Sequence, residues 1–227
     1  MSKDLDKAFV DVRNAFRLLD QYQERVLQIV SYIREQTPYT DMWGARWYFN
    51  KIGKRRDSPD SEYADISVWK DMWGWDFLYG YIFEYYFGLN KFSNKKAEFS
   101  MFQISDDGFF LSGQENKHMT KVASFAPAEQ SHSYLLFNVS VFSRDCHLWL
   151  CDPELPNDTS EDFLTKFLAS SLDTKIVHNE KGEVNILKKY EMQLFTSQQT
   201  ADDVIKDYGK LVKDQAGIEL FKKDFYL

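Results

Sequence analysis

The chain has 227 residues, of which 44% are hydrophobic and 17% aromatic, and its formal net charge is −7. Binding to nucleic acid or to anionic lipid through charge alone needs a basic surface, so an acidic chain of this kind is not expected to use either partner. The length suits one domain over residues 1–227, and nineteen Phe and thirteen Tyr predict a core rich in aromatic rings.

The sequence gives no sign of export or membrane insertion. The N-terminal residues carry acids throughout and no apolar run, unlike a signal peptide. No stretch reaches the ~20 apolar residues that span a bilayer. Cys146 and Cys151 are too few to cross-link a secreted domain, and we expect both to be reduced thiols. These features predict a cytoplasmic protein.

A long N-terminal helix is predicted over residues 1–37. Apolar side chains recur at alternating spacings of four and three, with Gln23 as the single polar interruption: Leu5, Phe9, Val12, Phe16, Leu19, Val26, Val30 and Ile33. No Gly or Pro occurs before Pro38, which allows one helix of ~50 Å. The row could pack on the chain's own sheet or form the seam of a coiled-coil homodimer, and additional apolar positions beside it favour the first.

Residues 38–72 are predicted to be irregular, with an aromatic first part and a polar second part. Because aromatic side chains are favoured at interaction hot spots, four tryptophans in or next to this segment are candidate binding residues: Trp43, Trp47, Trp69 and Trp73. The alternative is that the same tryptophans close the edge of the core. The densest basic cluster also lies here and could hold a phosphate or an acidic partner: Lys51, Lys54, Arg55 and Arg56. Acids that follow directly favour instead a solvated loop whose charges neutralise one another.

Residues 73–152 are predicted to form an antiparallel sheet. Apolar runs predict strands over 73–88, 97–105, 109–117, 133–143 and 147–151. The first run alternates aromatic residues with others at period two, which is the pattern of a strand with two unlike faces. Asp107-Gly108 predicts a two-residue hairpin between the second and third strands.

Residues 153–227 are predicted to form two helices with a hairpin between them. Capping-box-like starts at Thr159 and Thr200 open the helices, and the polar run 179–183 marks the hairpin. The apolar tail after residue 216 is expected to dock on the domain. The expected fold is therefore α+β, with a long N-terminal helix packed on a mainly antiparallel, aromatic-rich sheet of five or more strands and two C-terminal helices.

One constellation could carry chemistry. Glu115-Asn116-Lys117 lies on a predicted strand after a helix and two strands, an order that resembles the PD-(D/E)xK nuclease core, where an acid and E-x-K bind Mg²⁺ and orient water. The hairpin register places Glu98 opposite Lys117, so Glu98, Glu115 and Lys117 would share one face. A solvent-exposed cross-strand ion pair would place the same residues together without any activity.

No phosphate-binding glycine loop, nucleophile elbow or zinc-protease motif occurs in the sequence. We therefore expect a non-catalytic interaction protein without a cofactor, acting through an exposed aromatic and acidic surface that suits a basic protein partner. Self-association through the N-terminal helix is a further expectation. Two alternatives stay open: a metal-dependent nuclease that uses Mg²⁺, and a small-molecule binder with an aromatic pocket.

Overall fold

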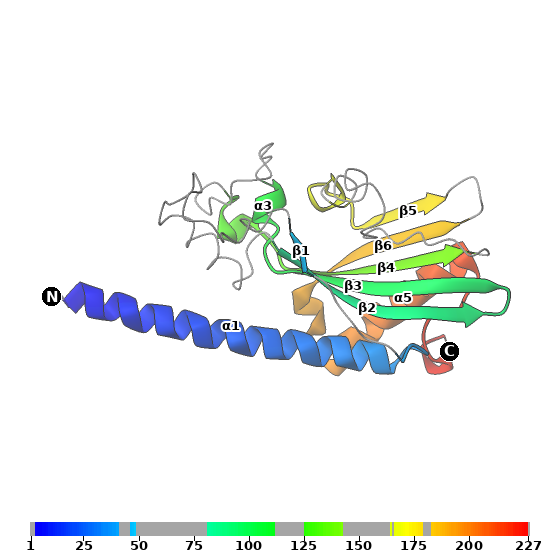
Figure 1. Cartoon of the computed structure of the whole chain (residues 1–227), viewed down its shortest axis with the longest axis horizontal. Coiled ribbons are helices and arrows are strands. Elements are labelled where there is room, and N and C mark those ends of the chain that lie inside the picture. Colours follow the sequence, from blue (N-terminus) through cyan, green and yellow to red (C-terminus); the bar gives the residue numbers. More distant parts are fainter. Residues whose placement is uncertain are drawn as a thin grey trace, which may run out of the picture.

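The structure is a computed structural model of the chain. It describes residues 3–40, 46–48, 81–111, 125–142, 164, 166–178 and 183–226. Figure 1 shows a sheet with two helices, α1 and α5, against one of its faces, and α1 continues well beyond the end of the sheet. Because of this overhang, the two ends of α1 have different surroundings.

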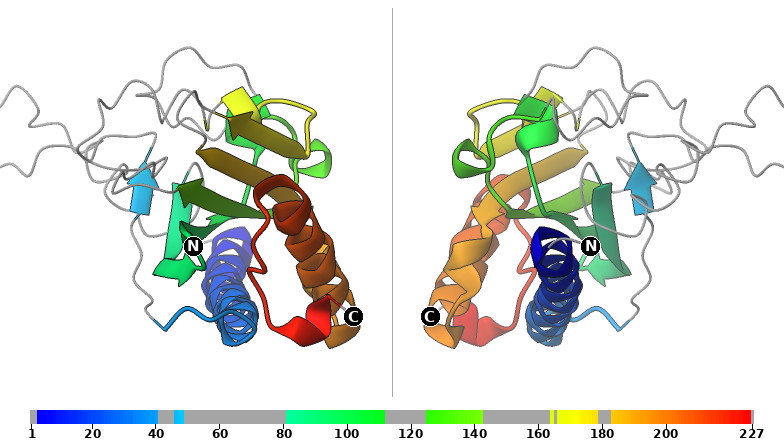
Figure 2. Two further views of the ribbon diagram at one scale, coloured as in Figure 1. Left: turned by 90° about the vertical axis from the view of Figure 1, so that its right-hand side faces the viewer. Right: turned by 90° about the vertical axis from the view of Figure 1, so that its left-hand side faces the viewer.

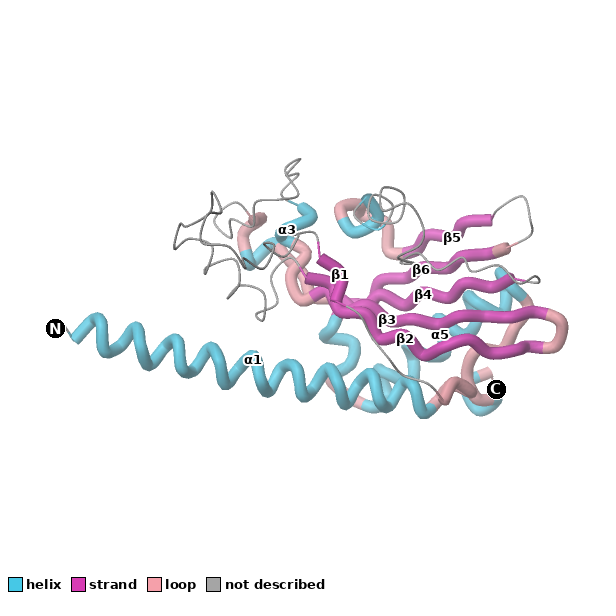
Figure 3. Tube along the Cα trace, in the orientation of Figure 1, coloured by secondary structure: helices cyan, strands magenta, loops and turns pink. Residues whose placement is uncertain are grey.

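Within the described ranges the sheet has six strands in the order β1-β2-β3-β4-β6-β5, and every neighbouring pair is antiparallel. The strands are β1 (Arg46–Tyr48), β2 (Tyr81–Phe92), β3 (Lys95–Ile104), β4 (Tyr134–Phe142), β5 (Thr174–His178) and β6 (Val184–Glu191). Figure 3 shows them side by side, with β5 at one edge. The predicted antiparallel sheet and the hairpin pairing of β5 with β6 are confirmed, and the edge strand β1 arises within a segment predicted to be irregular.

The predicted N-terminal helix is confirmed as α1 (Lys3–Glu35). Among the described residues, the other helical elements are α3 (Gly108–Leu111), α5 (Gln198–Ala216) and the 3-10 turns Ala128–Gln130, Met192–Phe195 and Lys223–Phe225. Residues 164 and 166–168 are also helical. The start predicted for α5 was three residues late, because Ser197 is the N-cap and Thr200 is its capping-box partner. Gly217 closes α5 at φ 67°, a left-handed conformation that glycine adopts without strain.

The aromatic alternation predicted for residues 73–88 holds along the described part of β2 as far as a bulge. Tyr86 pairs with Ser100 but Gly88 pairs with Phe99, so Phe87 is the extra residue. Gly88 has φ 99°, which the bulge requires and which other residues rarely adopt. Residues 73–80 lie outside the described part of the chain.

The predicted Asp107-Gly108 hairpin is wrong. The Asp107 carbonyl accepts from the Phe110 amide at 2.9 Å, and the Asp106 carboxylate accepts from the Gly108 amide at 2.8 Å, so this dipeptide opens α3 instead. Both edges of β3 are occupied, by β2 and by β4, which leaves no place for a third strand. Gly108 is needed for close packing, because a Cβ there would lie 2.5 Å from Ser131 Oγ.

The larger core lies between one face of the sheet and the two helices, which Figure 2 shows end-on. Phe99 is at its centre, with ring centroids 5.0 Å from Phe87, 5.9 Å from Phe137 and 6.0 Å from Phe221. Phe221 belongs to the C-terminal tail, so the predicted docking of the tail is confirmed. Aromatic rings from strand, helix and tail thus fill one continuous core.

The opposite face of the sheet carries a smaller apolar cluster near α3. Its buried members are Ile82, Phe102, Ile104, Phe110, Leu136, Leu164, Phe167, Leu168 and Leu187. Adjacent strand residues alternate between the two clusters, as Phe137 and Leu136 do on β4. Both faces of the sheet are therefore buried along part of their length.

Candidate functional site

Helix α1 consists of two halves with different surroundings. Every side chain from Leu5 to Leu18 is exposed, whereas Val26, Val30 and Ile33 are buried in the larger core. We call residues 3–18 the projecting half and residues 19–35 the packed half. At 1.5 Å per residue the projecting half is ~24 Å long. Figure 1 shows that α1 continues beyond the end of the sheet.

The projecting half keeps the apolar row of the packed half. Leu5 is 39% exposed, Phe9 48%, Val12 52% and Phe16 38%. Ala8 and Ala15 lie on one edge of this row, and together these residues form the apolar stripe: Leu5, Ala8, Phe9, Val12, Ala15 and Phe16. An apolar helix face that leaves large side chains in contact with water is typical of a binding surface.

A polar ring marks the point where α1 meets the core. Gln23 Nε2 donates to Tyr85 Oη at 3.2 Å, Tyr85 Oη donates to Gln103 Oε1 at 2.7 Å, and Gln103 Nε2 donates back to Gln23 Oε1 at 3.2 Å. Gln103 is fully buried, so its amide needs these partners. The one polar interruption of the apolar row is thus a structural hydrogen-bond partner of the sheet.

Burial governs the ionisation of the tyrosines at this point. It raises the pKa of Tyr85 to about 12, although the hydrogen bond with Gln23 acts the other way. It also raises the pKa of Tyr22, whose hydroxyl donates to Ser105 Oγ at 3.3 Å. Both phenols stay neutral at physiological pH and act as hydrogen-bonding groups rather than as acids or bases.

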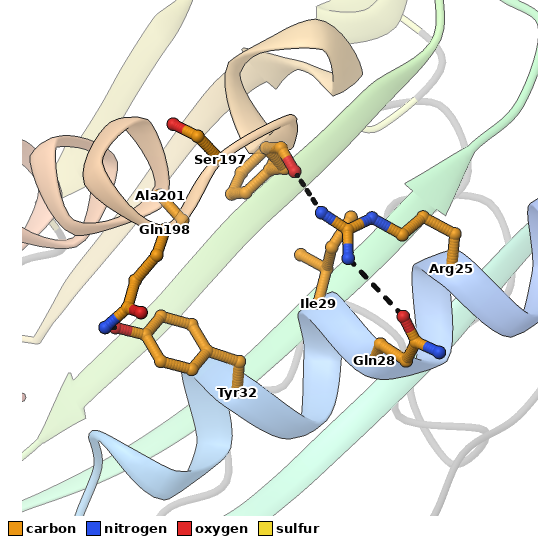
Figure 4. A pocket seen from close by; sticks show the side chains of 8 residues that line it. Arg25, Gln28, Ile29, Tyr32, Ser197, Gln198 and Ala201 are labelled. Atoms are coloured by element: carbon orange, nitrogen blue, oxygen red, sulfur yellow. Dashed lines mark hydrogen bonds between the residues drawn. The ribbon is translucent and has the colours of Figure 1, made fainter.

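A shallow recess of about 190 Å³ lies between the packed half of α1 and the start of α5 (Figure 4). Arg25 donates to the Phe195 carbonyl at 3.1 Å, and Gln198 Nε2 donates to Tyr32 Oη at 3.3 Å. Tyr32 in turn donates to Asp202. These polar groups pair with one another across the recess, so they fasten α1 to α5 and to the 3-10 turn before it rather than line a ligand site.

The second sheet face carries a row of polar side chains beyond its apolar cluster, all of them buried except Asn185, which is partly buried. The register places Glu98 beside Ser140 and Ser140 beside Asn185, and it places Ser100 beside Asn138. Ser100 Oγ donates to Glu84 at 2.9 Å, and Asn185 Nδ2 donates to Ser140 Oγ at 3.1 Å. We call these residues the polar row: Glu84, Glu98, Ser100, Asn138, Ser140 and Asn185.

Two amide oxygens of the polar row are buried without a donor. Within the part of the chain that the structure describes, neither Asn138 Oδ1 nor Asn185 Oδ1 accepts a hydrogen bond. Asn138 is 1% exposed, so solvent does not reach it directly. Buried acceptors of this kind normally have a partner, which makes the polar row a place where a small donor group could bind.

Lys189 is a buried amine on the same face of the sheet. Its Nζ donates to the Ser170 carbonyl at 2.9 Å and lies 5.5 Å from the Tyr134 ring centroid and 5.1 Å from that of Phe167. Burial lowers the pKa of this amine and raises the pKa of Tyr134 to about 12. The amine is held by a carbonyl and two rings, which fits an anchor for helical residues 166–168 better than a nucleophile.

The predicted nuclease constellation loses its geometric basis. Glu98 lies on β3 and pairs with Leu89 on β2 and Ser140 on β4, so it is not opposite Lys117. Glu115 and Lys117 lie outside the described residues. Among the described residues no group of three or more His, Cys, Asp or Glu side chains could hold a metal ion.

Most of the predicted binding residues lie outside the described ranges: Trp43, Trp69, Trp73, Lys54, Arg55 and Arg56. Trp47 lies on β1, where its backbone pairs with Ile82, and its side chain is outside the described part. The apolar stripe was predicted as part of the helix row, but its exposure depends on where the sheet ends. None of the helices that the structure describes is both long and apolar enough to cross a membrane.

The sequence model of one protein family, described as PM0109, matches residues 2–217. The chain belongs to the PM0109 family. The match spans α1 to α5, so the projecting half lies within the region that defines this family. No curated protein and no solved structure matches the chain.

Proposed function

We propose that this chain is a protein-interaction module whose docking element is the projecting half of α1. The observation that carries the proposal is the exposure of the apolar stripe, where four large side chains each keep more than a third of their surface in water. Covering what remains exposed of such side chains is worth ~1 kcal/mol per residue. A partner that covers the stripe would therefore gain several such contributions to its binding free energy.

The charge of the docking element differs from that of the whole chain. Residues 3–18 carry four basic and three acidic side chains, namely Lys3, Lys7, Arg13, Arg17 and Asp4, Asp6, Asp11, although the net charge of the chain is −7. A nearly neutral, apolar helix face favours an apolar partner helix over the basic partner suggested by overall composition. We therefore assign binding to the stripe rather than to an acidic surface.

Two double variants test this proposal. Phe9→Asp/Val12→Asp puts charges on the stripe, and Val10→Asp/Leu18→Asp puts them on exposed apolar positions outside it. Tagged wild type and both variants are used to capture partners from the native cells, with recovered proteins identified by mass spectrometry. We expect the same partner with wild type and Val10→Asp/Leu18→Asp, and a loss of at least about tenfold with Phe9→Asp/Val12→Asp.

The control for folding is the thermal unfolding temperature, which all three proteins should share because the changed positions are exposed. A partner that binds Phe9→Asp/Val12→Asp as well as it binds wild type would show that docking uses another surface. Recovery of no specific partner, including further copies of the chain itself, would also count against the proposal.

A second candidate function is the binding of a small polar ligand at the polar row. Asn138 Oδ1 favours it, as a buried acceptor without a donor among the described residues. A metabolite and metal-ion panel, including Mg²⁺, should raise the unfolding temperature of wild type but not of Asn138→Leu if the row binds a member of the panel. An equal shift in both proteins, or no shift in either, would remove this candidate.

A further inference from the structure

The charges beside the apolar stripe follow a pattern that suits a second copy of the same helix. Asp6 and Arg13 lie seven residues apart along one edge of the stripe, and Ala8 and Ala15 lie seven apart along the other. Two antiparallel helices that share an apolar seam bring equivalent edges together, charged edge to charged edge and alanine edge to alanine edge. A parallel pair brings unlike edges together instead.

We propose that the partner of the apolar stripe is a second copy of this chain, packed antiparallel with Phe9 opposite Val12 of the second copy. This inference rests on the proposed function and names its partner. By the two-fold symmetry of such a pair, Val12 also lies opposite Phe9 of the second copy. Phe9 then meets the smaller Val12 and Phe16 meets the smaller Leu5 of the second copy, which allows the two rows to interdigitate.

The same register also brings favourable side-chain pairs together along both edges of the apolar stripe. Asp6 lies beside Arg13 of the second copy, and the symmetric contact repeats this pair at the other end of the seam. Ala8 lies beside Ala15 of the second copy, and two small side chains allow the helix backbones to approach closely on that edge. In a parallel pair Asp6 and Arg13 would face the alanine edge and would gain no opposite charge.

The register also fits the length of helix that is exposed. With Phe9 opposite Val12, Lys3 at the start of α1 lies opposite Leu18 of the second copy, so the overlap covers residues 3–18. Side chains are exposed as far as Leu18, and Leu19 is the first that is partly buried on the chain's own core. The seam therefore ends where the packed half begins, with the two sheets at opposite ends.

The overall charge does not oppose this pairing at the seam. Two copies of a chain with net charge −7 repel one another at long range. The projecting halves, with one excess positive charge each, contribute almost nothing to this repulsion. Salt at physiological concentration screens the acidic remainder of each chain, since its Debye length is ~8 Å.

Charge reversal tests both the partner and its orientation. Asp6→Arg leaves two arginines facing each other at each end of the seam, and Arg13→Asp leaves two aspartates, so each variant should self-associate about tenfold more weakly than wild type. In a one-to-one mixture of the two variants, both pairs become opposite in charge and association should return to the wild-type level. Lys7→Asp, on the outer side of α1, serves as a matched control that leaves association unchanged.

Sedimentation equilibrium of each protein and of the mixture gives these dissociation constants. A mixture that associates no better than its two components would overturn the antiparallel register while leaving self-association in place. Wild type that stays a single chain at ~100 µM would overturn the second copy as partner. The proposed function would then depend on the capture experiment alone, so the two failures are distinguishable.

Discussion

The two halves of α1 share one sequence pattern and differ in what covers it. In the packed half, Val26, Val30 and Ile33 are buried against the sheet and α5. In the projecting half the same row, represented by Phe9 and Val12, is exposed because the sheet ends first. An apolar row at helical spacing therefore predicts that a face will be covered, but it does not say whether the chain's own core or another chain covers it.

The largest expected difference comes from truncating matched positions in the two halves. Ile33→Ala should lower the free energy of unfolding by ~2–5 kcal/mol, because it leaves a cavity in the closely packed core. Leu5→Ala should change it by at most ~0.5 kcal/mol, because Leu5 is exposed in the single chain. Urea unfolding at a concentration low enough to dissociate any dimer measures both. Equal losses would mean that the two halves are not distinct.

A smaller effect is expected at the polar ring between the halves. Gln103→Leu removes the partner of both Gln23 and Tyr85, which leaves buried polar groups without hydrogen bonds. The free energy of unfolding should fall by ~1–3 kcal/mol. The leucine side chain would fill nearly the same volume as the glutamine, so this loss reports on hydrogen bonding rather than on a cavity. A neutral result would mean that the ring does not fasten α1 to the sheet.

The polar ring between the two halves of α1 should also affect how stability depends on pH. Burial raises the pKa of Tyr85 from its ordinary value near 10 to about 12. Between these values the unfolded chain has released the proton while the folded chain retains it, so stability is intact below pH ~10 and falls as pH rises toward 12. Tyr85→Phe should make this fall less steep in urea titrations between about pH 9 and 12. An unchanged slope would mean that Tyr85 does not contribute to it.

Much of the fold could be predicted from the sequence, because long periodic runs determine helices and strands. The row from Leu5 to Ile33 predicted α1, and the apolar runs predicted β3, β4 and the β5–β6 hairpin. The hairpin predicted at Asp107-Gly108 was wrong because a local turn signal does not determine which strand pairs with β3. Once β4 pairs with β3, the dipeptide serves as the start of α3.

The candidate site was harder to predict than the fold. The positions of the stripe were visible as apolar spacing, but their exposure depends on the length of β2 and β3 relative to α1, which no local pattern encodes. Gln23 was the one local sign of the boundary, as a polar residue in the apolar row. Asn138 on β4 could not be identified as buried, since a polar residue within a strand usually indicates a solvent-facing side.

Sedimentation velocity of wild type beside Phe9→Asp/Val12→Asp tests most directly whether the projecting half binds another chain. We predict that wild type at ~100 µM sediments at about twice its single-chain mass of 26.9 kDa. The variant should sediment as a single chain with an unchanged circular dichroism spectrum, because the two positions are exposed within one chain. Wild type that sediments as a 26.9 kDa single chain, or a variant that still forms the dimer, would contradict this prediction.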